Sequence, residues 1–190
     1  SLNGILHPSA VTVHSPIDYI FEGPGSLSGD MELLKAGPGT LTLNAGNDYH
    51  GKTTVIQGTL LVNGTLSQSP VEVHPDASLG GKGTLGNGLT LFGKGSLMVG
   101  GKDHPDTLRI SNHLTVKDEA NLIFDLSNDT SGVSKPNDLL LVTGDLVLEG
   151  DNTIDIRMLD NYLNSGSYTL VKFTGTFTGD INRTPVSYTH

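Results

Sequence analysis

The chain has 190 residues, of which 35% are hydrophobic and only 16% are charged, and its formal net charge is -9. Such a charge, without clustered Lys and Arg, excludes a nucleic-acid partner and gives no attraction to an anionic membrane. The absence of cysteine excludes disulfides and thiolate metal sites, and no apolar run approaches the roughly 20 residues that a membrane-spanning helix needs.

Short runs in which apolar and polar residues alternate follow one another along the chain, each closed by Gly, Asn or Asp. In chain order they include 11–13, 40–43, 71–73, 89–91, 114–116, 123–126, 146–148 and 154–156. Alternation with a step of two is the pattern of a β-strand, and no window shows a sustained helical stripe. Residues 30–36 could form one helical turn, but their context favours a strand. The sequence predicts an all-β fold.

A repeated pattern decides how these strands are arranged. A small residue, Thr or Ser, and then Leu precede a glycine turn at Leu41, Leu60, Leu79 and Leu97, at steps of 19, 19 and 18 residues. A looser set continues at Leu122, Leu146 and Leu170, at steps of 25, 24 and 24. Steps of this size match one coil of a β-solenoid, in which each coil buries its apolar face by stacking on its neighbours.

We therefore predict one parallel β-solenoid domain over residues 1–190, with a repeat-like core at 33–101 and C-terminal coils at 107–190. It would have about eight coils, with inward Leu, Val and Ile stacked about 4.8 Å apart along a rod of roughly 40 Å. A β-sandwich is the alternative, because strands spaced by eight to twelve residues also occur in that fold. The strand-like run at 186–190 suggests a fragment of a longer protein, whose other domains would be its partners.

The strongest catalytic candidates are Asp103, Asp106 and Arg109, which lie close together in the sequence. Paired carboxylates can act as general acid and base, and an arginine can hold an anionic sugar. The Pro and Asp content of residues 103–106 is equally typical of a loop between coils, and we favour that interpretation. The catalytic residues, if any exist, are therefore unknown at this stage.

Four aspartates of the second half form a candidate calcium site: Asp125, Asp129, Asp138 and Asp145. Calcium needs six to eight oxygen ligands, which such a cluster could supply in part. Their spacing matches no known calcium loop, so solvated turns are the favoured interpretation. We expect no resident metal and no cofactor.

One segment resembles a known family. Residues 33–44 read LLKAGPGTLTLN, and residues 47–64 read NDYHGKTTVIQGTLLVNG. This resembles the autotransporter-associated β-strand repeat, also called the passenger-associated transport repeat, which combines Lys-x-Gly-x-Gly-Thr-Leu-x-Leu, Asn-x-Tyr-x-Gly and Thr-Thr-Val-x-x-Gly-Thr-Leu. His50 stands where Thr or Ser is usual, and Lys52 where Gly is usual. Residues 137–146 and 166–173 resemble, less specifically, the segments that follow such repeats.

The resemblance implies a right-handed parallel β-helix in a bacterial protein that is extracellular or on the outer cell surface. The repeat itself contributes no catalytic residues, so the expected function is a non-catalytic stalk, scaffold or adhesive segment, with glycans or a host surface as partners. Two alternatives stay open. The first is the β-helix portion of a polysaccharide lyase or glycoside hydrolase, and the second is a β-sandwich binding module.

Overall fold

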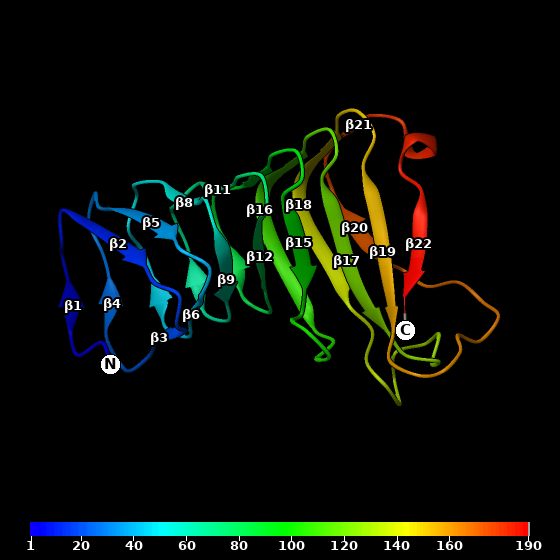
Figure 1. Ribbon diagram of the computed structural model, residues 1–190, viewed down its shortest axis with the longest axis horizontal. Coiled ribbons are helices and arrows are strands. Elements are labelled where there is room, and N and C mark those ends of the chain that lie inside the picture. Colours follow the sequence, from blue (N-terminus) through cyan, green and yellow to red (C-terminus); the bar gives the residue numbers. More distant parts are fainter. Residues whose placement is uncertain (190) are drawn as a thin grey trace.

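The computed structural model describes residues 1–189, so His190, the last residue of the predicted run 186–190, lies outside the described residues. The chain winds into a rod whose first and last coils lie at opposite ends (Figure 1). All strand pairs of residues 1–189 are parallel. This confirms a right-handed parallel β-helix and shows that the β-sandwich alternative is wrong. Residues 30–36, which could have formed a helical turn, contain β5 (Glu32–Ala36).

One face of the rod is an eight-stranded sheet to which each coil contributes one strand, which confirms the predicted eight coils. Its strands are β3 (Tyr19–Phe21), β6 (Thr40–Leu43), β9 (Gly58–Val62), β12 (Ala77–Gly81), β15 (Ser96–Val99), β17 (Asn121–Leu126), β19 (Thr153–Met158) and β22 (Val186–Thr189). Neighbouring strands pair residue for residue, so each inward side chain stacks on its equivalent in the next coil.

The first coils have two further short faces. One contains β2 (Ala10–His14), β5, β8 (Thr53–Val55), β11 (Val71–Val73) and β14 (Leu89–Leu91). The other contains β7 (Gly46–Asn47), β10 (Thr65–Leu66) and β13 (Thr84–Leu85), preceded by the pair β1 (Ile5–Leu6) and β4 (Ser26–Leu27).

The two short faces merge at β16 (Thr107–Val116), which pairs with both β13 and β14. Beyond it lie β18 (Leu139–Leu148), β20 (Val171–Phe173) and β21 (Phe177–Thr178). The long strands bend at Asn112 and its partner Gly144, both at positive φ. A Cβ on Gly144 would lie only 1.3 Å from the Asn112 carbonyl oxygen, so the bend requires glycine there.

The predicted leucine column is confirmed in its first five positions. Leu41, Leu60, Leu79, Leu97 and Leu122 pair in register and are buried. The predicted continuation is wrong, because Leu146 belongs to β18 in the other sheet and Leu170 lies before β20. The column continues through Ile154 and Val186, each 32 residues further on.

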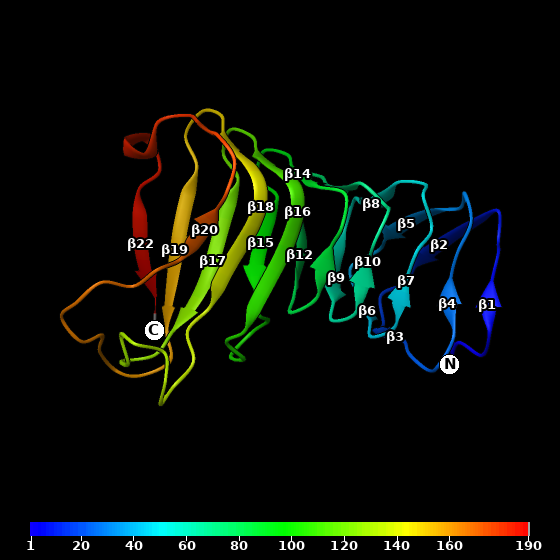
Figure 2. The same cartoon turned by 180° about the vertical axis from the view of Figure 1, so that it is seen from behind.

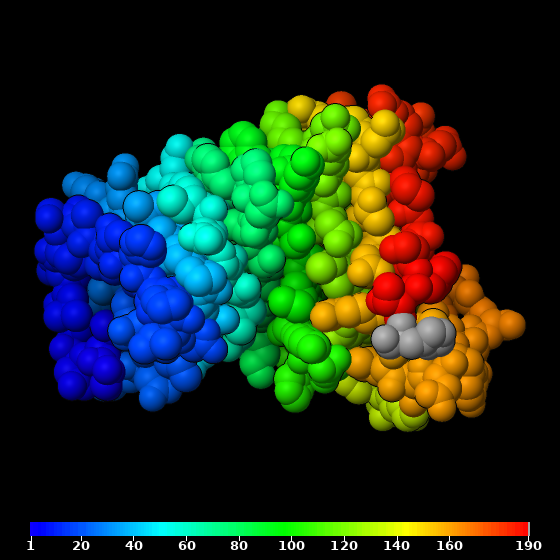
Figure 3. All heavy atoms as spheres, in the orientation of Figure 1, coloured from blue at the N-terminus to red at the C-terminus, as the bar shows by residue number. Residues whose placement is uncertain are grey.

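The longer steps arise at one corner of the rod, between the eight-stranded sheet and the next face. In three early coils this corner is only residues 44–45, 63–64 and 82–83. In later coils it becomes three loops, 100–106, 127–138 and 159–170, which we call the corner loops. They project from the same side of the rod, which is the lower side in Figures 1 and 2, and the space-filling view shows the rod broadening there (Figure 3).

Candidate functional site

The polar residues of the repeat motif lie inside the rod. Lys35 stands in the same inward column as Val13 and Val55, and it is buried. Its Nζ donates to the carbonyl oxygens of Gly37 and Gln57, at 2.7 and 2.9 Å. Burial lowers the pKa of Lys35, while the charge of Asp18 opposes this effect. The lysine therefore ties the corners of two successive coils together.

Asn47 and Tyr49 also have structural positions. The Asn47 side chain accepts from the Leu27 backbone N–H at 3.0 Å. The Tyr49 hydroxyl is 2.6 Å from Thr53 Oγ1, which is 2.8 Å from Ser69 Oγ, and burial raises the pKa of Tyr49 to about 12. Buried polar groups that satisfy one another in this way fix the register between coils.

The two departures from the motif face outward. His50 is exposed, and Lys52 forms an ion pair with Glu72 at 2.8 Å. Neither side chain enters the core, so the usual residues can be replaced here without disturbing the column. The repeat segment thus uses its buried polar groups for structure and leaves none of them directed at a ligand.

The candidate functional site is a groove at the corner loops. Two cavities of about 580 and 510 Å³ adjoin one another and share Pro105, Asp106 and Pro136 in their walls. The first cavity extends back over the tight corners of earlier coils, where Asn63 and Lys82 line it. The second extends forward to β20 and the loop 127–138, with Lys172, Thr130 and Asn137 in its walls. We call the two cavities together the corner groove.

The predicted catalytic trio is only partly brought together. Asp106 lines the corner groove, and its carboxylate is 3.8 Å from the Lys82 ammonium. Asp103 has a positive φ of 59° and uses its backbone N–H to contact Asp125 Oδ2 at 2.7 Å. Arg109 is exposed on β16, where its Nη1 is 3.4 Å from its neighbour Thr107's carbonyl oxygen. Within residues 1–189, Arg109 forms no ion pair with either aspartate.

Asp125 and Asp138 are fully buried and hold the corner loops to the core. Asp138 accepts from the backbone N–H groups of Asp106 and Asp125, at 2.9 and 2.7 Å. Asp125 forms an ion pair with Arg157 at 2.7 Å. Burial raises the pKa of Asp138 to about 8 and also raises that of Asp125, although the hydrogen bonds and Arg157 favour the ionised forms.

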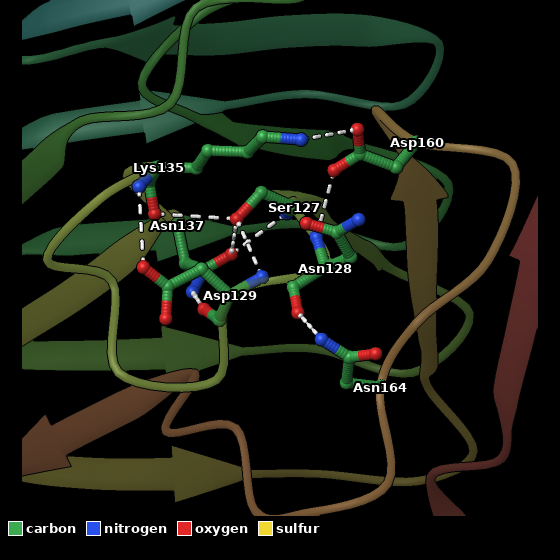
Figure 4. A network of polar contacts seen from close by, with 7 residues as sticks. All are labelled: Ser127, Asn128, Asp129, Lys135, Asn137, Asp160 and Asn164. Carbon is green, nitrogen blue, oxygen red and sulfur yellow. Dashed lines mark hydrogen bonds and ion pairs between the residues drawn. The ribbon is translucent and has the colours of Figure 1, made fainter.

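Asp129 organises the loop 127–138 from within (Figure 4). Its carboxylate accepts from the Ser131 hydroxyl and from the backbone N–H groups of Ser131, Ser134 and Lys135, and these contacts hold its pKa below the usual range. Asp160, on the next corner loop, accepts from the Asn128 N–H at 2.8 Å and from the Lys135 ammonium at 2.7 Å. The corner loops are therefore fastened to one another as well as to the core.

The fourth predicted calcium candidate, Asp145, is exposed on β18, where it accepts from the Thr176 backbone N–H at 2.7 Å. Asp129 is occupied by its own loop, and only Asp125 and Asp138 are in direct contact. Across residues 1–189, no three His, Asp or Glu side chains lie together in a way that could hold a metal ion.

Several residues of this region were not singled out from the sequence. Arg157, Asp160, Asn137 and Lys172 reach the corner from segments far from residues 103–109. Their contact could not be inferred, because it depends on the register between coils of unequal length. The one available signal is the concentration of Asn, Asp, Ser and Gly in residues 127–138 and 159–167, which predicts loops.

Comparison with known proteins identifies a repeat family and two similar bacterial proteins. Residues 33–62 match the family Passenger-associated-transport-repeat. The adhesin BmaC autotransporter of Brucella suis biovar 1 (strain 1330) is 32% identical over 154 residues, which are 80% of this chain and 4% of the adhesin. An extracellular serine protease of Serratia marcescens is 42% identical over 60 residues, which are 32% of this chain and 6% of the protease. The chain thus spans a small part of the length of these relatives.

The uninterrupted parallel coils and the internal polar residues define a β-helical repeat protein. With the matched repeat at residues 33–62 and the similarity to an autotransporter adhesin, the chain is an autotransporter-associated repeat protein, as the motif of residues 33–64 implies. The helical part of residues 1–189 is a three-residue 3-10 turn at Ile181–Arg183. No helix of the described residues is long and apolar enough to cross a membrane.

Proposed function

We propose that the chain is a non-catalytic β-helical stalk segment of a secreted or surface-exposed bacterial protein, and that it carries the corner loops outward on a rigid rod. The observation that carries this proposal is the unbroken register of eight strands from β3 to β22. A column that continues across all coils resists bending and separates its two ends by a fixed distance.

The end of the rod at β22 supports a role within a larger β-helical protein. The core columns terminate there in Phe173, Phe177 and Val186, all of which are exposed. Phe173 and Phe177 line an apolar cavity of about 300 Å³ together with Ile181. Another β-helical coil would bury them just as each coil buries its neighbour, so we propose that other parts of the same parent protein are its immediate partners.

Surface display tests the stalk role. The chain is placed between an N-terminal epitope and an outer-membrane anchor in a Gram-negative host. We expect the epitope on the cell surface, and we expect the chain to resist protease added to intact cells. A Leu79→Ala/Leu97→Ala variant, which interrupts the column, should be displayed less and cleaved faster. A folded wild-type chain that fails to present the epitope would overturn the proposal.

A polysaccharide-degrading activity is a second candidate, favoured by the half-exposed Asp106 carboxylate inside a groove that also contains Lys82. The assay is turnover of uronic-acid and neutral polysaccharides by the purified chain, with Asp103→Ala and Asp106→Ala as variants. Reproducible turnover that either substitution abolishes would replace the non-catalytic assignment.

A further inference from the structure

The corner groove gathers positive charge on an acidic protein. Lys82, Lys102 and His104 line its first cavity, and Lys172 lines the second. The carboxylates in its walls are Asp106 and the buried Asp138. The whole chain has a net charge of -9, so this local excess of cationic groups is contrary to the overall composition.

The groove lysines are poorly neutralised. Lys102 and Lys172 form no ion pair with any described residue, and Lys82 is only loosely paired with Asp106, at 3.8 Å. By contrast, Lys52 and Lys117, outside the groove, pair with glutamates at 2.8 and 2.6 Å. The ammonium groups at the groove therefore remain available to an anionic ligand.

The positive surface continues along the sheet beside the groove. Arg109 pairs in register with Leu141, which pairs in register with Lys172. Residues in register on parallel strands point to the same side, so Arg109 and Lys172 face outward about 10 Å apart, two strand spacings. This arrangement suits a ligand with several charges along its length better than a single small anion.

The remaining lining suits a sugar. Thr130 and Asn63 present a hydroxyl and an amide group in the two cavities, whereas the Ser131 and Asn137 side chains, which also line the groove, are hydrogen-bonded within the loop 127–138. Such groups both donate to and accept from sugar hydroxyls. No Phe, Tyr or Trp ring is among the described residues that line the groove, so recognition here would depend on charge and hydrogen bonds instead of ring stacking.

The groove is also held in shape before any ligand arrives. Asp138 binds the backbone of Asp106, which lies in the groove wall, and Asp125 binds that of Asp103. Both carboxylates are fully buried, so these contacts are protected from water. Walls fixed in this way reduce the conformational entropy lost on binding.

We propose that the corner groove binds an acidic polysaccharide, with uronate carboxylates facing Lys82, Lys102 and Lys172 and sugar hydroxyls facing the amide and hydroxyl groups. This proposal rests on the proposed function as an exposed stalk segment, and it names the ligand class that the corner loops would meet. Because the contacts are mainly ionic and exposed, affinity falls as salt is raised.

The test measures binding of the purified chain to polygalacturonate, with neutral dextran and poly-glutamate as comparison polymers. The groove variant is Lys82→Gln/Lys102→Gln/Lys172→Gln. The matched control, Lys52→Gln/Lys94→Gln/Lys117→Gln, changes the net charge equally at lysines outside the groove lining. We expect salt-sensitive binding to polygalacturonate, weakened about tenfold or more in the groove variant and less than about twofold in the control.

Three results would overturn the proposal: no binding to polygalacturonate, equal losses in the two variants, or equally tight binding to poly-glutamate, which would point to an acidic peptide. Thermal unfolding and surface display of the groove variant are measured alongside. A groove variant that loses binding but is displayed like the wild type separates this proposal from the stalk role. Conversely, failure of wild-type display with intact polygalacturonate binding would count against the stalk alone.

Discussion

The early and late coils of this β-helix solve the same packing problem with different numbers of residues. From β6 to β15, each coil passes through a two-residue corner, and its inward residues follow one another at steps of 18 or 19. From β15 to β22, the corner loops lengthen the step first to 25 and then to 32 residues, yet the strands stay in register. The spacing between coils is set by backbone hydrogen bonding, so loops can grow at a corner without altering the core.

The early and late coils also differ in what their buried polar groups contact. In the early coils the buried polar residues Lys35, Asn47 and Thr53 join neighbouring coils within the core. In the late coils buried carboxylates instead fasten the loops, as Asp125 and Asp138 do. The buried polar groups of the early coils therefore stabilise a regular stack, whereas those of the late coils hold the loops that form the corner groove.

The largest expected effect comes from the shared column. Leu79→Ala removes a fully buried side chain that stacks between Leu60 and Leu97, and should lower the free energy of unfolding by about 2–5 kcal/mol. Val133→Ala is the control, because Val133 is 86% exposed on a corner loop. Its effect should stay within about 0.5 kcal/mol. Urea titration followed by circular dichroism measures the free energy of unfolding of both variants. Equal losses of stability would contradict the claim that the column, and not the corner loops, stabilises the fold.

A tight corner should tolerate added bulk poorly. A Cβ on Gly83 would lie 2.1 Å from the Gly64 carbonyl oxygen of the preceding coil. Gly83→Ala therefore forces the two corners apart, and we expect a loss of about 1–3 kcal/mol. In the control Gly46→Ala, the nearest atom is Thr65 Oγ1 at 3.1 Å, so a small side-chain movement suffices. If chemical denaturation gives the two variants equal free energies of unfolding, the close approach of the two corners does not determine which substitutions are tolerated.

Buried Asp138 should make stability depend on pH. Its pKa is raised to about 8 in the folded chain, above its ordinary value of 3.8, so the folded state holds a proton that the unfolded state has released. Stability therefore falls as the pH rises from about 4 to about 8, by at most about 1.4 kcal/mol per pH unit. Asp138→Asn cannot ionise and should flatten this dependence.

Melting temperatures between pH 5 and pH 9 measure the effect. The control is Asp145→Asn, which replaces an exposed carboxylate and should keep the wild-type profile. A wild-type profile that rises over this range, or an Asp138→Asn profile with an unchanged slope, would show that Asp138 is ionised when folded.

The smallest expected effect concerns the internal polar chain of the repeat. Tyr49→Phe removes the hydroxyl that contacts Thr53 at 2.6 Å, while Thr53 keeps its contact with Ser69. We expect a loss of about 1 kcal/mol. Tyr162→Phe, at an exposed position on the corner loop 159–170, should be neutral within error. If denaturant titration gives the two variants equal free energies of unfolding, the buried Tyr49 hydroxyl contributes nothing to stability.

The sequence was informative where coils are short and regular. Leu41, Leu60 and Leu79 follow at nearly constant steps, so their stacking could be predicted from the repeat alone. The prediction is wrong at Leu146 and Leu170, because an extended loop changes the number of residues between equivalent positions of successive coils without leaving a periodic signal. The sequence shows Asp125 and Asp138 as candidate site residues, but their hydrogen bonds to the loop backbone depend on the three-dimensional register.

The most direct measurement concerns the spacing between coils. The chain has no native cysteine, so spin labels can be placed at chosen sites on the outward row Thr40, Thr59, Ser78, Ser96, Asn121 and Thr153. Pulsed electron paramagnetic resonance on the pairs Thr40→Cys/Asn121→Cys and Thr40→Cys/Thr153→Cys should give distances that differ by about 5 Å, one strand spacing. A difference several times larger, or a shorter distance for the second pair, would contradict the stacking of long and short coils at one common spacing.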